Sequence, residues 1–318
     1  MNDIAALSRR VTEECEKIIV GKRDVIRLIV MAVLADGHVL LDDLPGVGKT
    51  TLVKTLTRAL GCDSRRVQFV PDLLPADILG MKIYDQKAGD FRTVQGPVVT
   101  NLLLADEINR AMPRTQAALL EAMEERQISI DGETTALPRP FLVLATQNPV
   151  ESESTFRLPA AQMDRFLVCL SMGYPQPEEE RQMLASLGDR IPFETVETVT
   201  DAGELLRMQE ESAGVFVSQP MMDYIVSLCH ATREQPAVKV GVSPRGTRSL
   251  FRAAKVWAAM EGRSFVLPED VQTLAVPVLA HRLVLTGEAR FSGKTAAGIL
   301  EEIVAAVPVP PLPGDLIP

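Results

Sequence analysis

The segment DLPGVGKT, from Asp43 to Thr50, limits what this chain can fold into more than any other part of the sequence. It follows a short apolar run, His38 to Leu41, and it leads into an amphipathic segment that runs from Lys49 toward Gly61. A strand, a glycine-bearing loop and a helix in this order form a cradle for phosphates. The glycines let backbone N–H groups turn inward, and the helix dipole favours an anion at the helix start. The context therefore predicts a P-loop.

The residue types inside this loop each match a part of a nucleoside triphosphate. We expect the Lys49 ammonium to reach the β- and γ-phosphates and the Thr50 hydroxyl to ligate Mg²⁺. The common GxxxxGK[ST] pattern has glycine at the position of Asp43, so the sequence departs from the pattern there. The residues expected to bind the nucleotide are Pro45, Gly46, Val47, Gly48, Lys49, Thr50 and Thr51.

Two acidic residues follow another apolar run and fit the same site. The run from Leu102 to Ala105 leads directly into Asp106 and Glu107. Ligands of open α/β folds bind at the carboxyl edge of the sheet, where these acids would lie. We expect Asp106 to hold Mg²⁺ through water, and Glu107 to orient and polarise the attacking water. The alternative is a strand that ends in a solvated acidic turn, and the P-loop favours the catalytic interpretation.

Three further polar residues are candidates for contacts with the γ-phosphate. Asn148 follows the apolar run from Phe141 to Ala145, although an Asn-Pro pair by itself indicates only a turn. Arg165 precedes the last apolar run, and Arg245 begins a predicted helix. A guanidinium at the γ-phosphate stabilises the charge of the transition state. Spacing alone leaves a surface or helix-terminal ion pair as the alternative for both arginines.

Strand-length apolar runs alternate with helical patterns in the first part of the chain, which indicates a mostly parallel sheet covered on both faces. The five runs are His38 to Leu41, Val67 to Val70, Leu102 to Ala105, Phe141 to Ala145 and Phe166 to Leu170. Beyond the segment from Gly173 to Pro177 the patterns are helical. We therefore predict an α/β domain with N-terminal helices at residues 1–172. A smaller helical domain with a proline-rich tail follows at 173–318.

Charge and composition favour a protein partner over nucleic acid. The formal net charge is −9, whereas nucleic-acid binding draws on cationic surface. The most apolar region, Val25 to Leu41, is interrupted by charged residues, and the N-terminus lacks the apolar core of a signal peptide. We therefore expect a cytoplasmic location without a membrane span. The four cysteines and three histidines are scattered without metal-ligand spacing, so we expect no zinc site.

In content and order, the segments LPGVGKT, LLLADEINRA, LVLATQNP, LPAAQMDRF and GVSPRG resemble the motifs of the MoxR family of AAA+ ATPases, within the clade that carries an insert in the second helix. The resemblance extends over essentially the whole chain, and an acid at the position of Asp43 is common in this family. It implies a P-loop NTPase core of αβα layers around a mostly parallel five-stranded sheet, with a C-terminal all-α lid. It also implies ATP and Mg²⁺ as cofactors.

The resemblance assigns roles to residues that spacing leaves open. Asn148 would be sensor 1, Arg245 would be sensor 2, and Arg165 would be the arginine finger that reaches a neighbouring subunit's ATP. Val20 and Gly21 match the segment that lies against the adenine. The segments Ile83 to Val94 and Ile128 to Pro138 match two hairpin insertions that usually face the ring pore or the client, with plain surface hairpins as the alternative.

The implied function is that of an ATP-hydrolysing, chaperone-like subunit of a hexameric ring, which remodels or matures protein complexes. Its partner would be a separate protein with a von Willebrand factor A domain. Gln68 is a candidate for coupling client binding to Glu107. One alternative is a helicase-like motor stimulated by nucleic acid, against which stand the net charge and the acidic hairpin tip at Asp131 and Glu133. Another is a nucleotide-gated scaffold with little turnover.

Overall fold

The computed structural model describes residues 2–43, 46–148, 155–186 and 193–311. These residues form two compact units that interleave along the chain. The sheet unit comprises residues 9–158 and 170–206, and the helical unit comprises residues 1–8, 159–169 and 207–318. Because the units interleave, the expected domain boundary after residue 172 stays a prediction. Among the described residues, no helix is both long enough and apolar enough to cross a membrane.

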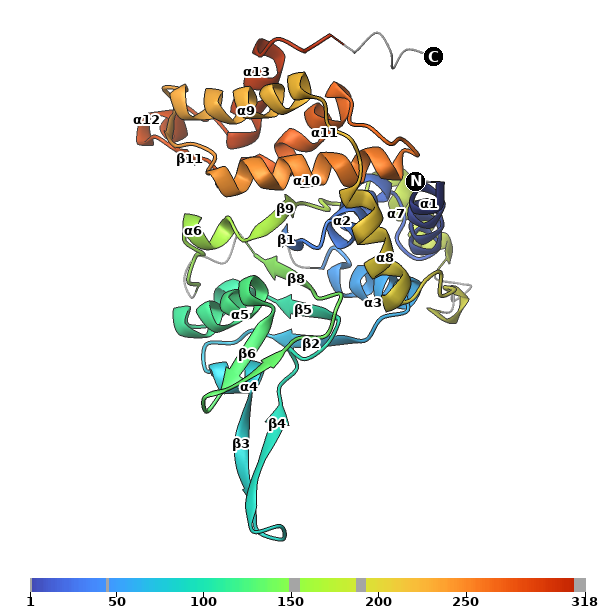
Figure 1. The fold of residues 1–318 in the computed structure, drawn as a ribbon, viewed down its shortest axis with the longest axis vertical. Coiled ribbons are helices and arrows are strands. Elements are labelled where there is room, and N and C mark those ends of the chain that lie inside the picture. Colours follow the sequence, from blue (N-terminus) through green and yellow to red (C-terminus); the bar gives the residue numbers. More distant parts are fainter. Residues whose placement is uncertain (1, 44–45, 149–154, 187–192, 312–318) are drawn as a thin grey trace. The chain divides into compact units, whose positions relative to one another are not determined.

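A five-stranded sheet with the order β2-β5-β8-β1-β9 carries the expected α/β core (Figure 1). The pairs β2–β5, β5–β8 and β8–β1 are all parallel. Parallel neighbours need crossover connections, which the helices between these strands supply. The strands are β1 (His38–Asp42), β2 (Ser64–Gln68), β5 (Leu102–Asp106), β8 (Leu142–Gln147) and β9 (Phe166–Leu170).

Four of these strands lie close to where the apolar runs predict them, and β2 begins earlier than expected. The expected run was Val67 to Val70, whereas β2 covers Ser64–Gln68 and is mostly exposed. It lies at the edge of the sheet and four of its five residues are exposed, so the apolar pattern misses its start. The central strands β1, β5 and β8 are buried almost throughout, as continuous apolar runs in parallel sheets usually are.

Helices pack beside the strands of the sheet unit, with α2 next to β1 and α3 next to β5. Helix α3 begins directly after the glycine-bearing loop and ends at Gly61, whose left-handed backbone caps it. The helical segments that fall wholly or partly in this unit are α1 (Asn2–Glu16), α2 (Arg23–Leu34), α3 (Lys49–Leu60), α4 (Pro75–Leu79), η1 (Ile108–Arg110), α5 (Pro113–Glu125), α7 (Pro177–Ser186), η2 (Phe193–Thr195) and α8 (Ala202–Ala213).

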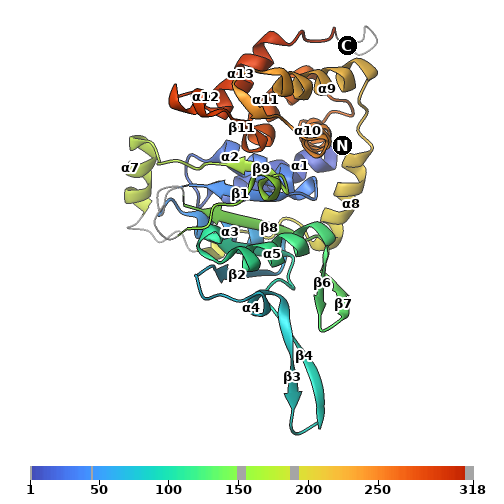
Figure 2. The same ribbon diagram turned by 90° about the vertical axis from the view of Figure 1, so that its left-hand side faces the viewer.

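Both expected hairpins are present in the sheet unit as separate two-stranded antiparallel sheets. The longer one pairs β3 (Gly80–Asp85) with β4 (Asp90–Gln95) and extends well beyond the five-stranded sheet (Figure 2). The shorter one pairs β6 (Gln127–Ile130) with β7 (Glu133–Ala136). Near the tip of the longer hairpin, the exposed rings of Tyr84 and Phe91 meet edge to face, with centroids 5.3 Å apart.

The helical unit packs α10 against α9 and α11, and α13 against α9 and α11. Side-chain oxygens of Ser218, Ser243, Thr286 and Thr295 accept N–H bonds at the starts of four of its helices, which explains why those helices begin there. Its further elements are α6 (Ala160–Met163), α9 (Gln219–Glu234), β10 (Val238–Val240), α10 (Pro244–Met260), α11 (Pro268–Leu279), η3 (Ala280–Arg282), β11 (Val284–Leu285), α12 (Gly287–Phe291) and α13 (Ala296–Ala306).

Candidate nucleotide-binding site

The loop between β1 and α3 has the backbone of a phosphate cradle. Gly46 and Gly48 have φ angles of 84° and 86°, in the left-handed region that favours glycine. A Cβ at either position would meet nothing within 4 Å, so the glycines are needed for the backbone conformation and the space in front of them is open. The N-cap of α3 is Gly48, which has no side chain to cap the helix, so the first N–H groups of α3 are available to an anion. Pro45 lies outside the described residues.

Asp43, which replaces the usual glycine, has a structural partner. Its carboxylate is buried and accepts hydrogen bonds from the Ser171 hydroxyl (3.1 Å), the Gly173 amide (3.2 Å) and the Met172 amide. The Lys49 ammonium donates to the carbonyl oxygen of Asp43 at 3.0 Å. The acid therefore fixes the base of the loop to the segment after β9, and its side chain points away from the cradle. Thr50 and Thr51 lie in the first turn of α3.

The two acids lie at the carboxyl end of β5, as expected, and Thr146 of the neighbouring β8 holds both. The Thr146 hydroxyl donates to Asp106 Oδ1 at 2.7 Å and accepts from the Glu107 amide at 2.8 Å. Glu107 has a φ of 56°, which is uncommon for a residue with a side chain. Such strained backbone persists where the surroundings over-determine it, and it clusters at functional sites.

The same two acids are also engaged by cationic and amide groups of the sheet unit. Arg66 Nη2 lies 2.7 Å from Asp106 Oδ2, and the Gln68 amide donates to Glu107 Oε2 at 2.8 Å. Arg110 Nη1 contacts the same Oε2 at 3.1 Å. Gln68 therefore contacts Glu107, and its role in coupling client binding to Glu107 stays a prediction. Arg66 and Gln68 are two residues apart on β2 and so share one face of the strand, a signal that the sequence analysis did not use.

The strand order brings Asn148 to the same edge of the sheet. β8 lies between β5, which carries the acids, and β1, which leads into the P-loop, and Asn148 follows β8 directly. Asn148 is buried, and its carbonyl oxygen accepts from Asn109 Nδ2 at 3.2 Å. Thr146 was not among the expected site residues, although it occupies the polar end of the same run.

Val20 and Gly21 lie between α1 and α2, in the sheet unit. Gly21 has a φ of 72°, in the left-handed region that favours glycine, and a Cβ there would come within 1.8 Å of Glu179 Oε1, so that side chain would have to move. The next residue, Lys22, donates to the Tyr174 carbonyl at 3.1 Å. The segment is thereby tied to residues 174–179, and its contact with an adenine stays a prediction.

The two expected arginines belong to the helical unit. Arg165 lies between α6 and β9, and its amide donates to the Gln162 carbonyl at 3.2 Å. Arg245 lies in the first turn of α10, two residues after the cap Ser243. Their roles as arginine finger and sensor 2 stay predictions.

The chemistry of this edge of the sheet fits magnesium and a nucleoside triphosphate. Mg²⁺ prefers oxygen ligands, often one or two protein oxygens completed by phosphates and water, and Thr50 and Asp106 supply such oxygens. The uncapped helix start and Lys49 supply donors for phosphate. A P-loop, an acid pair and a polar strand end on three adjacent strands define the class of P-loop NTPases.

Comparisons with known proteins agree with this class. Residues 38–168 match the model of the ATPase family associated with various cellular activities (AAA), and residues 230–303 match the AAA lid domain. The chain is 46% identical to "Uncharacterized protein YeaC" of Bacillus subtilis (strain 168), over 97% of this chain and 96% of that protein.

Two further relatives sharpen the comparison. "Chaperone MoxR1" of Mycobacterium tuberculosis is 43% identical over 93% of this chain and 81% of its own length. A crystal structure from Cytophaga hutchinsonii, described as that of a candidate ATPase, superposes with a TM-score of 0.91 at 36% identity, covering 98% of this chain and 97% of the other. The chain belongs to the MoxR family of AAA+ ATPases.

Proposed function

We propose that this protein binds and hydrolyses ATP with Mg²⁺ and uses the energy to remodel or mature protein complexes. The observation that carries the proposal is the open cradle of Gly46 and Gly48 at the uncapped start of α3. It lies two strands away, in the same sheet, from the paired acids at the end of β5. Donors for phosphate and oxygens for a hard cation and for water meet at one edge.

The residues divide the work of phosphoryl transfer between them. The α3 amides and Lys49 bind the β- and γ-phosphates, and Thr50 with Asp106 holds the metal. Bound Mg²⁺ neutralises the charge that develops on the phosphate oxygens. Glu107 orients the attacking water and accepts its proton, and Asn148 positions the water or the γ-phosphate.

Neighbouring side chains bind both Asp106 and Glu107 in the structure, and the proposed catalysis requires these contacts to open. The contacts of Gln68 and Arg110 both engage Glu107 Oε2, and Arg66 engages Asp106 Oδ2. Mg²⁺ and its water shell therefore compete with Arg66 for Asp106. The hydrogen bond from Gln68, at the end of β2, to Glu107 supports the proposal that Gln68 links client binding to hydrolysis.

We further propose that the protein works as a ring, with six subunits as the expected number. Arg165 would then complete the neighbouring subunit's site as arginine finger, and Arg245 would contact the γ-phosphate as sensor 2. Val20 and Gly21 would lie against the adenine. The proposal draws on the chain's membership of the family.

The proposed clients are protein complexes, and the proposed partner is a separate protein with a von Willebrand factor A domain. The relative named Chaperone MoxR1 supports a chaperone-like role. Exposed aromatic rings on the β3–β4 hairpin suit contact with protein, because aromatic residues are enriched at protein interfaces. The proposed site of action is the cytoplasm.

Two variants test the ATPase proposal. Lys49→Ala should abolish binding of a fluorescent ATP analogue, whereas Lys54→Ala, an exposed lysine on the same helix, should bind normally. Glu107→Gln should bind ATP but lower kcat by about 10² to 10⁴-fold, as loss of a general base does. Glu121→Gln, on the exposed side of α5, is its control. Intact ATP affinity in Lys49→Ala would contradict the proposed phosphate cradle.

The client proposal needs a separate measurement. Glu107→Gln locked with ATP should retain client and partner proteins in a pull-down, and Lys49→Ala should not. Salt-dependent, several-fold stimulation of ATP hydrolysis by DNA would instead favour a nucleic-acid motor. Turnover near zero in the presence of all candidate partners would favour a nucleotide-gated scaffold.

A further inference from the structure

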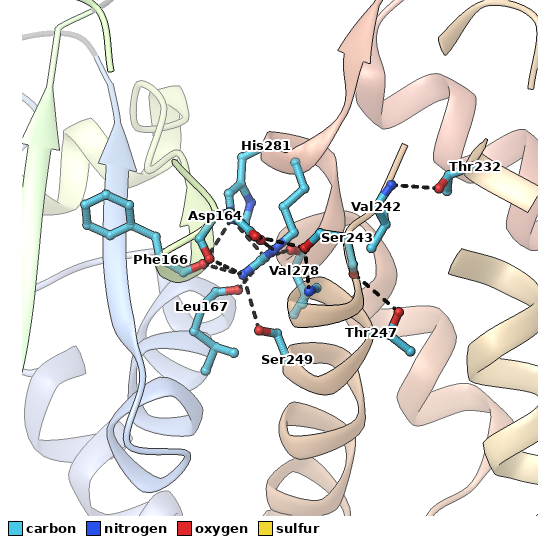
Figure 3. Close-up of polar contacts among 12 residues, drawn as sticks. Asp164, Phe166, Leu167, Thr232, Val242, Ser243, Thr247, Ser249, Val278 and His281 are labelled. Carbon is cyan, nitrogen blue, oxygen red and sulfur yellow. Dashed lines mark hydrogen bonds and ion pairs between the residues drawn. The ribbon is translucent and has the colours of Figure 1, made fainter. Parts of the chain in front are cut away.

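One buried arginine of the helical unit, Arg282, ties the segment around Arg165 to the helix that carries Arg245. Its side chain is 2% exposed, and its Nε donates to Asp164 Oδ1 at 2.7 Å. The groups around it are shown in Figure 3. The guanidinium also donates to the carbonyl oxygens of Phe166 (2.6 Å), Leu167 (3.2 Å) and Val278, and to the Ser249 hydroxyl (3.3 Å).

Asp164 uses its second carboxylate oxygen to hold the start of α10. The Ser243 hydroxyl donates to Asp164 Oδ2 at 2.8 Å and accepts from the Gly246 amide at 3.2 Å (Figure 3). Ser243 is thus both the N-cap of α10 and a partner of the carboxylate. By comparison, the N-cap Ser218 of α9 accepts from the Met221 amide. We call Asp164, Ser243 and Arg282 the arginine mount.

Close packing at the first turn of α10 supports the mount. A Cβ at Gly246 would come within 2.6 Å of Val242 Cγ1 and within 2.8 Å of Arg282 Cδ. The Arg282 stem therefore rests against this turn because glycine leaves room for it. The charge of Arg245 also reaches the mount, since it contributes to a lowered pKa of Arg282, after the larger effect of burial.

The mount lies beside both arginines that the proposed function assigns to the γ-phosphate. Arg165 follows Asp164 directly, and Arg245 is two residues beyond Ser243. Charge-assisted hydrogen bonds to a buried guanidinium are short and directional, and guanidinium geometry is rigid. Displacing one of these anchors by an ångström would therefore displace the other.

We propose that Asp164, Ser243 and Arg282 are positioning residues that hold Arg165 and Arg245 at a fixed separation. A displacement of one arginine, caused by a change in the nucleotide that it contacts, therefore also displaces the other arginine. The inference rests on the proposed function, in which Arg165 serves a neighbouring subunit. Because Asp164, which directly precedes Arg165, accepts a hydrogen bond from Ser243, two residues before Arg245, the mount links the sites of adjacent subunits. It transmits the position of a side chain without contacting ATP itself.

The test compares two N-cap serines of the same unit. Ser243→Ala removes the cap of α10 and one bond to Asp164, whereas Ser218→Ala removes a cap alone. We expect Ser243→Ala to lower kcat for ATP by about 10-fold, since misplacement of a catalytic group by an ångström costs up to about 10²-fold. ATP affinity should stay within about 3-fold, and the Tm should fall at least as much as in Ser218→Ala, because the bond to Asp164 is lost as well. Ser243→Thr, which keeps the hydroxyl, should restore kcat.

Mixed rings separate positioning from a general structural defect. Ser243→Ala subunits mixed with Lys49→Ala subunits receive an intact finger from their neighbours, so turnover per competent site should rise. Arg165→Ala subunits mixed in the same way are the reference. If Arg165→Ala is rescued while Ser243→Ala loses no more kcat than Ser218→Ala, the mount is refuted and the proposed function stands. If Arg165→Ala is not rescued in rings shown to be mixed, the shared site fails, and the mount fails with it.

Discussion

Two arginine–aspartate pairs of this protein have the same N–O distance, and their arginines differ strongly in exposure. Arg66–Asp106 at the proposed metal site and Arg282–Asp164 in the arginine mount both measure 2.7 Å. The Arg66 side chain is 50% exposed and that of Arg282 is 2% exposed. An exposed ion pair contributes little net free energy and opens easily. Separating a buried pair leaves an uncompensated charge in the protein interior, and this cost keeps a buried pair closed.

The difference matches what each region has to do. In the proposed function, Asp106 exchanges Arg66 for Mg²⁺ and water, and a weak pair suits that exchange. In the proposed arginine mount, Asp164 keeps two segments together, and a pair with a buried arginine suits that role. The N–O distance is the same in both pairs, so the following substitutions test whether the burial of the arginine decides how much each pair contributes to stability.

The largest effect is expected from Asp164→Ala. The substitution leaves the buried Arg282 guanidinium without its carboxylate, which should lower the free energy of unfolding by about 3–5 kcal/mol. Denaturant unfolding followed by circular dichroism measures it. A loss below about 1 kcal/mol, similar to that of an exposed pair, would remove the contrast between the two regions.

A smaller effect is expected from Asp43→Gly, which restores the common P-loop pattern. The Ser171 hydroxyl and the amides of Met172 and Gly173 would lose a buried acceptor. We expect a loss of about 2 kcal/mol in the free energy of unfolding, the cost of leaving buried donors unsatisfied. Asp42→Gly, one residue earlier, controls for the added backbone freedom. An unchanged free energy of unfolding would show that the buried Asp43 carboxylate, which has amide and hydroxyl partners, does not stabilise the loop.

The pH dependence of stability should be altered by His281, which contacts the mount. Burial, and then the charge of Arg282, hold the pKa of His281 well below its ordinary value of 6.5. Because the folded form stays neutral while the unfolded chain takes up a proton, stability falls as the pH drops below that ordinary value. Between about pH 7.5 and about pH 5.5 the wild type should lose about 1.4 kcal/mol more than His281→Gln. Parallel pH profiles of the two proteins would contradict this.

The smallest effect is expected from Arg66→Ala. The loss in unfolding free energy should stay below about 1 kcal/mol, because the pair is exposed. Removing the competitor for Asp106 should instead strengthen apparent Mg²⁺ binding in the presence of ATP by about 2- to 5-fold, the equivalent of the same free energy. A magnesium titration with a fluorescent ATP analogue measures it, and Arg65→Ala, on the other face of β2, is the control. Weaker magnesium binding would mean that Arg66 assists the metal.

Local signals explain why so much of the core was predictable. The loop at Gly46 and Gly48, the acids after β5 and the helix starts at Ser218 and Ser243 are encoded within a few neighbouring residues. Their conformations follow from glycine freedom, strand ends and capping. The five strands were predicted from apolar runs in the same way, whereas both hairpins were predicted from the resemblance to the family.

Pairings between distant segments were not predictable in this way. Arg66 and Asp106 are 40 residues apart, and Asp164 and Arg282 are 118 apart. Each pairing depends on the register of strands or the packing of helices, which periodicity does not specify. Asp43 appeared as a departure from a pattern, and only its partners after β9 show that it anchors the loop. The start of β2 was missed because an exposed edge strand carries no apolar run.

Because β3 and β4 form a two-stranded sheet of their own, the length of their hairpin can change independently of the five-stranded sheet. At the base of the hairpin, a Cβ on Gly80 would lie 2.3 Å from the Val94 carbonyl oxygen. A Cβ on Gly96 would lie 2.1 Å from the Ile78 carbonyl oxygen. The backbone segments can therefore approach this closely only because both residues are glycine. Beyond these glycines, adding one residue to each strand lengthens the hairpin, while the register of the five-stranded sheet stays the same. The hairpin tip, with Tyr84 and Phe91, can thus change in sequence or length while the five-stranded sheet stays the same.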